Sequence, residues 1–143
     1  MPDSYRWFVL IDSRKARLLR ASHTGKGSLH LDEVASLATT FVAGEHHRPD
    51  RLGAPGRSAG TGHEHAEKLA HFARELAPWL QKQLVAQAVT HCDLFSPAHM
   101  LGELRKSLGK ALTTKLVEHD VELTGLPIAQ LAVHPRIQAL WAS

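Results

Sequence analysis

The chain has 143 residues, a net charge of +3 and a single cysteine, Cys92. This length allows one domain with a substantial apolar core, and a lone cysteine forms no internal disulfide, so we expect a cytoplasmic protein. The apolar run from Trp7 to Ile11 is too short for a signal peptide or a membrane span, so we expect no membrane partner.

The positive charge is concentrated in the first half of the chain. Residues 1–43 carry six Lys/Arg against four Asp/Glu, residues 44–62 three against two, and residues 63–143 eight against eight. Proteins that bind nucleic acid usually show a denser basic stripe. The charge therefore fits either a phosphate-bearing partner or an ordinary, mildly basic surface.

The first 40 residues predict three strands in an antiparallel meander. Residues 5–12 are almost continuously apolar, which is typical of a central strand covered on both faces. Turns then lead into strands over 15–23 and 28–37. Basic residues interrupt the second strand, and this predicts a sheet face partly open to solvent or to a partner. These residues are Lys15, Arg17 and Arg20.

Residues 44–62, GEHHRPDRLGAPGRSAGTG, contain five glycines and two prolines, with Leu52 the one large apolar residue. Such a composition cannot build a core, and compact domains seldom carry a loop this long without a purpose. We therefore expect a single domain over 1–143 with a flexible loop at 44–62. The loop is either a binding or reacting arm or a disordered linker.

The longest helix is predicted to follow this loop. Thr61 with Glu64 three residues later has the form of a capping box. Pro78 falls inside the apolar helical pattern that follows, which predicts a kink or break near Ala77. The pattern continues through Val89.

Shorter elements complete the chain. Residues 91–95 predict a strand, and Ser96-Pro97 a helix start with serine as the cap. A fifth strand is predicted over 116–123, and Pro127 opens a short last helix. Strands joined through helices are expected to be partly parallel.

Histidines and acidic residues suggest a metal site on the long helix. His63, Glu67 and His71 recur at four-residue spacing, and His46 and His47 lie close by in the sequence. The spacing is not the HExxH motif, and a polar helix face collects histidines without any metal. Both interpretations remain open from the sequence.

A second candidate set is acidic. Asp12, Glu64 or Glu67, and Asp93 are distributed as in the two-metal site of ribonuclease H folds, whose carboxylates must converge. Asp93 falls near the start of its strand, so we predict that it does not meet Asp12. The simpler prediction for Asp12 is a turn residue that binds the hairpin backbone.

The predicted helix start also favours an anion site. Backbone amides of Gly62, His63 and Glu64, with Arg57 nearby, would suit phosphate. No nucleotide motif is complete, so no cofactor is predicted. Cys92 between His91 and Asp93 is predicted to be a buried structural residue, because strand neighbours point to opposite faces.

The order of several motifs resembles the host attachment protein family. They are Val9-Leu10-Ile11-Asp12-Ser13-Arg14-Lys15-Ala16-Arg17-Leu18, Pro55-Gly56-Arg57-Ser58, His63-Glu64-His65, Phe72-Ala73-Arg74-Glu75-Leu76, Ser96-Pro97, Leu101-Gly102-x-Leu104-Arg105, Asp120 and Leu126-Pro127. Those proteins are similar to the middle domain of the archaeal and eukaryotic peptide-chain release factor. The resemblance implies an α/β, RNase H-like mixed five-stranded sheet in the order 3-2-1-4-5, flanked by helices.

In the release factor, the loop between the third strand and the long helix carries a Gly-Gly-Gln tip that enters the ribosomal peptidyl-transferase centre. The loop at 44–62 occupies that place here and contains no glutamine. Peptide release by the familiar mechanism is therefore not implied for this chain, and whether it catalyses any reaction is left open.

Three hypotheses follow. The first is a non-catalytic or cryptically catalytic release-factor-like domain that binds RNA or the ribosome through its loop. Arg48, Arg51 and Arg57 would contact phosphates, beside Gly62 and His63. The second is a protein-interaction or adhesion-related module whose loop orders on a protein partner. The third is a metal-dependent hydrolase or nuclease using His63, Glu67 and His71. The oligomeric state is not predicted.

Overall fold

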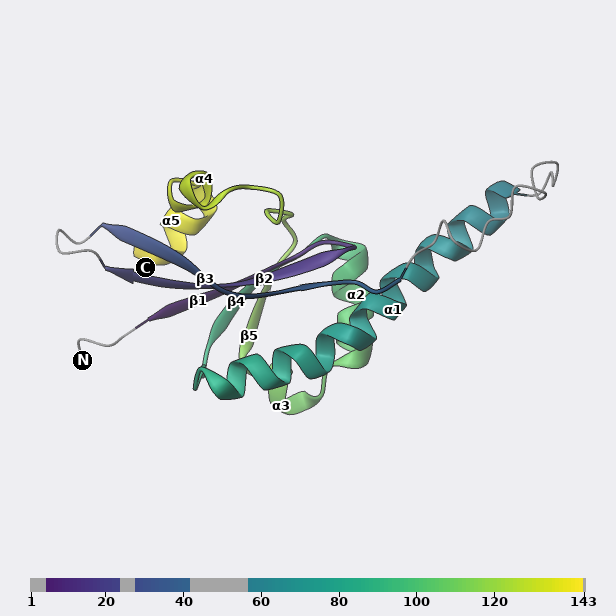
Figure 1. Ribbon diagram of the computed structural model, residues 1–143, viewed down its shortest axis with the longest axis horizontal. Coiled ribbons are helices and arrows are strands. Elements are labelled where there is room, and N and C mark those ends of the chain that lie inside the picture. Colours follow the sequence, from purple (N-terminus) through teal and green to yellow (C-terminus); the bar gives the residue numbers. More distant parts are fainter. Residues whose placement is uncertain (1–4, 24–27, 42–56, 143) are drawn as a thin grey trace.

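The computed structural model describes residues 5–23, 28–41 and 57–142, with the backbone alone for 57–64. One mixed sheet has the strand order β3-β2-β1-β4-β5 (Figure 1). β1 and β2 are antiparallel, as are β2 and β3, whereas β4 lies parallel to both β1 and β5. The expected fold class is confirmed. The strands are β1 Arg6–Ile11, β2 Lys15–His23, β3 Leu29–Ala38, β4 Cys92–Phe95 and β5 Leu116–His119.

Helices cover both faces of this sheet (Figure 1). They are α1 Arg57–Ala86, α2 Ala98–Ser107, α3 Lys110–Thr113, α4 Ile128–Ala132 and α5 Pro135–Ala142. α1 and α2 pack on one face, and α4 and α5 on the other. Among the helices described, none has the length and apolar character needed to cross a bilayer.

β1 explains why the core has two halves. Its side chains alternate, so Val9 and Ile11 belong to the cluster under α1 and α2, whereas Phe8 and Leu10 belong to the cluster under α4 and α5. All four are fully buried. A strand buried on both faces has the almost continuous apolar sequence that predicted its central place.

α1 differs from the prediction at two points. It begins at Arg57, four residues before the expected start at Thr61, so the last part of the predicted loop is helical. It also continues through Pro78 without a break. Leu76, Leu80 and Leu84 are fully buried on either side of this proline. Their packing offsets a cost of roughly 3 kcal/mol for a proline in a helix interior.

The end of α1 has a left-handed residue that is not glycine. Ala88 has a φ of 55°, and the N–H of Val89 donates to Leu84 O at 2.9 Å, while the N–H of Ala88 donates to Val85 O at 3.1 Å. This pair of bonds is the Schellman arrangement of helix ends. It ends the helix before Val89, which is where the sequence pattern extended it.

β2 is less open than its basic residues suggested. Arg17 is buried and reaches across to the chain that follows β5. Its Nη1 donates to the carbonyl oxygens of Thr124 at 2.9 Å and Leu126 at 2.7 Å, and its Nε donates to Glu33 Oε1 at 2.9 Å. The expectation of an open face is therefore wrong at Arg17, because this C-terminal segment covers it.

The C-terminal third also differs in detail. β5 ends at His119 instead of extending to Leu123, which is buried in the cluster under α4 and α5. Two short helices replace the single last helix that was expected, with Pro127 as the N-cap residue of the first. Alternating apolar residues after His119 thus belong to a covering segment and not to the sheet.

Candidate functional site

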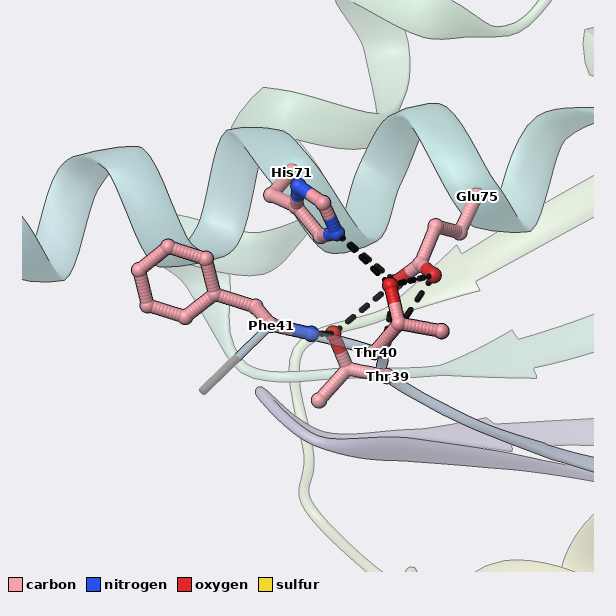
Figure 2. A network of polar contacts seen from close by, with 5 residues as sticks. All are labelled: Thr39, Thr40, Phe41, His71 and Glu75. Carbon is pink, nitrogen blue, oxygen red and sulfur yellow. Dashed lines mark hydrogen bonds and ion pairs between the residues drawn. The ribbon is translucent and has the colours of Figure 1, made fainter. Parts of the chain in front are cut away.

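Glu75 on α1 holds the chain where it leaves β3 (Figure 2). The hydroxyl of Thr39 donates to Glu75 Oε1 at 2.9 Å, and the hydroxyl of Thr40 donates to Oε2 at 2.6 Å. The backbone N–H of Thr40 lies 3.2 Å from each carboxylate oxygen. We call these contacts the Glu75 clamp. They fix the base of the connection between β3 and α1.

His71, one helical turn before Glu75, extends the clamp (Figure 2). Its Nε2 lies 3.0 Å from the hydroxyl oxygen of Thr40, whose proton goes to Glu75, so His71 donates this bond. The ring of Phe41 lies against the imidazole at 5.4 Å between centroids, and the N–H of Phe41 donates to the Thr39 hydroxyl. Three consecutive residues after β3 are therefore attached to one face of α1.

Glu75 is held in its charged form by these contacts. Partial burial by itself would raise the pKa of its carboxyl group, but the hydrogen bonds from Thr40 and Thr39 and the nearby His71 lower it below the ordinary value. The clamp is consequently an ionised acceptor with several donors. Charge-assisted bonds of this kind are shorter and stronger than neutral ones.

The structure describes the predicted phosphate-binding residues only in part. Arg48 and Arg51 lie outside the described residues, as do His46 and His47. Arg57 is the first residue of α1, and positions 62 and 63 fall in its second turn. Amides in the second turn of a regular helix donate to carbonyls four residues earlier. The helix start on which this anion site was predicted therefore lies at Arg57, and a binding role for Gly62 and His63 stays a prediction.

The predicted metal ligands are placed on one helix but are not shown to form a site. The side chain of His63 lies outside the described part, Glu67 is exposed, and His71 uses its Nε2 in the clamp. Among the side chains described, no group of three or more histidine, cysteine or acidic residues is arranged to hold a metal ion. The metal site stays a prediction.

The acidic residues behave as the sequence indicated. Asp12 Oδ1 accepts from the backbone N–H groups of Arg14 and Lys15, both at 2.7 Å, which confirms its role in the turn. Asp93 pairs in register with Phe8, four residues before Asp12, or roughly 13 Å along the strand. The two carboxylates do not meet.

Asp93 has partners of its own. It is buried, with Oδ1 3.0 Å from His119 Nε2 and Oδ2 3.4 Å from Arg6 Nε. Its neighbour Cys92 is fully buried too, and burial together with the charge of Asp93 raises the pKa of the thiol. The prediction that Cys92 is buried is confirmed.

A cavity of about 270 Å³ lies where β1 and β4 end. The turn after β1 contributes Asp12, Ser13 and Arg14, and the start of α2 contributes His99 and Met100. α1 adds His65 and Leu69, and Pro97 and Glu122 complete the lining. Carboxyl ends of adjacent parallel strands are the usual ligand position in open α/β sheets.

Sequence reasoning missed this cavity because its residues come from four separate segments. One signal was present: polar residues follow directly after both β1 and β4, at Asp12-Ser13-Arg14 and at Ser96-Pro97. The structure also changes the second of these, because Pro97 and not Ser96 is the N-cap residue of α2.

The sheet order, the long helix after the third strand and the tethered connection between them define an α/β domain with a mixed five-stranded sheet flanked by helices. Residues 6–134 match Bacterial archaeo-eukaryotic release factor family 12, and the chain belongs to this family. No curated protein matches the chain. This match supports the expected relation to release factors, and a role in attachment to host cells stays a prediction.

Proposed function

We propose that this chain is a release-factor-like domain that binds the ribosome or RNA through the connection between β3 and α1. The observation that carries the proposal is the Glu75 clamp, which fixes one end of this connection on a rigid helix. Binding segments held by a rigid scaffold are a common arrangement in proteins. Membership of a release-factor family supports the same conclusion.

The geometry of α1 supports presentation of this connection away from the core. His71 lies 14 residues after Arg57, which corresponds to roughly 21 Å of helix. The start of α1 extends beyond the edge of the sheet (Figure 1). Phe41 at the clamp and Arg57 at the start of α1 are the described residues on either side of 42–56 in the sequence.

The composition of the connection supplies the chemistry for phosphate. Arg48, Arg51 and Arg57 would contact phosphate oxygens, since a guanidinium group donates bidentate hydrogen bonds to them. Contacts of this type release counterions, so binding is expected to weaken as salt rises.

Ribosome co-sedimentation at low and moderate salt tests the proposal. Wild type is expected in the ribosomal fraction at low salt, with less of it there at moderate salt. Arg48→Ala/Arg51→Ala/Arg57→Ala is expected to stay in the supernatant. The control Lys82→Ala/Lys110→Ala/Arg136→Ala removes the same charge from exposed positions elsewhere and is expected to pellet like wild type. Equal pelleting of the two variants, or no pelleting of wild type, would contradict the proposal.

Further measurements test the two other hypotheses, the protein-interaction module and the metal-dependent hydrolase. A pull-down from nuclease-treated lysate that recovers one protein in stoichiometric amount would favour the protein-interaction or adhesion-related module. Metal analysis of tag-free protein with less than roughly a tenth of an equivalent of transition metal would dispose of the hydrolase that uses His63, Glu67 and His71.

A further inference from the structure

We infer that the cavity at the ends of β1 and β4 binds a single nucleotide, either free or as one unit of an RNA strand. Its volume of about 270 Å³ lies just below the usual range of small-molecule sites, which begins at about 300 Å³. One nucleotide fits such a space, whereas a longer oligonucleotide has to continue outside it. This inference deepens the proposed function and rests on it where the nucleotide belongs to RNA.

The lining offers both of the hydrogen-bonding characters that a nucleotide needs. Arg14 supplies donors for phosphate oxygens, and His65 and His99 supply ring nitrogens beside it. Glu122 supplies carboxylate acceptors for ribose hydroxyls or base N–H groups. A bare anion would have no use for this acceptor.

Apolar residues complete the match. Leu69, Pro97 and Met100 line the same cavity and give an apolar surface for the face of a base or ribose. α2 also begins here, and its first turn contains no acidic residue, so its amide groups add to the attraction of a phosphate.

These polar side chains are available for a ligand. Arg14, His65, His99 and Glu122 are exposed. Within the part of the chain that the structure describes, no hydrogen bond or ion pair engages the side chains of His65, His99 or Glu122. Ionisable side chains from separate elements thus converge on one cavity.

The cavity is joined to the base of the proposed RNA-binding connection. The N–H of Thr39 donates to Arg14 O at 2.8 Å, so the cavity wall and the clamped segment share a hydrogen bond. His65 and Leu69 lie on α1 between Arg57 and the clamp. The cavity therefore lies beside the stretch of α1 that leads from Arg57 to the clamp.

Isothermal titration calorimetry of the full chain tests the inference. The probes are uridine and adenosine 5′-monophosphates, uridine, inorganic phosphate and a six-residue oligouridylate. A mononucleotide is expected to bind more tightly than phosphate or nucleoside alone. Arg14→Ala and His99→Ala are each expected to weaken binding about tenfold, the effect of one lost charge-assisted hydrogen bond. Arg136→Ala, an exposed arginine outside the cavity, is expected to leave the affinity unchanged.

Each other outcome decides the inference as well. Binding of the oligouridylate alone, weakened by both cavity variants, supports a nucleotide that is recognised within RNA. Phosphate binding as tight as mononucleotide binding contradicts the inference, and so does the absence of binding by every probe at millimolar concentration. If the protein binds mononucleotides but does not pellet with ribosomes, the proposed function alone is refuted. If the loop variant fails to pellet while Arg14→Ala pellets and binds the probes like wild type, this inference alone is refuted.

Discussion

Two charged side chains each tie down a stretch of chain, and their surroundings differ. Arg17 fixes residues 124–126 from within the core, with a side-chain exposure of 9%. Glu75 fixes residues 39 and 40 at the surface, with a side-chain exposure of 21%. The first segment covers the sheet, and the second leads to the connection that we propose as the binding segment.

Because the two side chains differ in burial, we expect one to matter mainly for stability and the other mainly for binding. When one partner of a buried charged network is removed, water cannot reach the remaining groups to replace the lost hydrogen bonds. The free energy of unfolding therefore decreases. Water can replace many of the lost bonds at a partly exposed clamp. We therefore expect changes at Arg17 to lower the free energy of unfolding and changes at Glu75 to lower binding.

The largest expected effect is that of Arg17→Met. This change leaves Glu33 and two carbonyl groups without their donor, and we expect the free energy of unfolding to fall by about 3 kcal/mol. Urea denaturation measures this directly.

Arg20→Met on the same strand is the matched control. Arg20 and its partner Asp32 are both partly exposed, so the expected loss is about 1 kcal/mol or less. Equal losses for the two variants would break the distinction between buried and exposed tethers.

Glu75→Gln is expected to have a smaller effect on stability, a loss of about 1 kcal/mol at pH 7. The pKa of Glu75 is lowered in the folded state, so its contribution is fully present above the ordinary value of 4.5 and is lost as pH falls below it. The difference in unfolding free energy between wild type and Glu75→Gln should therefore shrink as the pH falls from 5 to 3.

Urea unfolding at pH 7, 5 and 3 checks this pH dependence. Glu103→Gln, which removes the same charge next to the exposed Lys106, provides the control and should show little difference from wild type at any of these pH values. A Glu75→Gln difference that persists unchanged at pH 3 would show that the ionised carboxylate does not hold the clamp.

The smallest effect is expected for Ala88→Gly. Relief of the left-handed conformation should raise the free energy of unfolding by about 0.5 kcal/mol. Ala88 follows the opposite end of α1 from the connection and belongs to neither tether. A raised thermal unfolding temperature with unchanged ribosome pelleting would show that stability and binding vary independently. A change in pelleting would argue against this independence.

The sequence predicted the strands more reliably than the helix ends. A strand buried on both faces has a continuous apolar run, which is why β1 was identified, and the turn role of Asp12 followed from local chemistry. The start of α1 was misplaced because glycines at 60 and 62 carry a local penalty that does not reveal how far a helix continues.

The hydrogen bonds of Arg17 and of the Glu75 clamp were not predictable from local sequence patterns. Arg17 bonds to residues more than 100 positions away, and the Glu75 clamp joins residues separated by 35 positions. No local rule indicates such partners. The cavity has the same origin, since it exists only where the ends of β1, β4 and the flank of α1 come together.

The most direct test of the account is a double-mutant cycle on ribosome affinity. It compares wild type, Glu75→Gln, the Arg48/Arg51/Arg57→Ala variant and the combination of both. If the clamp acts by positioning the arginines, Glu75→Gln should weaken binding in the wild-type background and have no further effect once the arginines are absent. Equal losses from Glu75→Gln in both backgrounds, or no loss in either, would contradict the account.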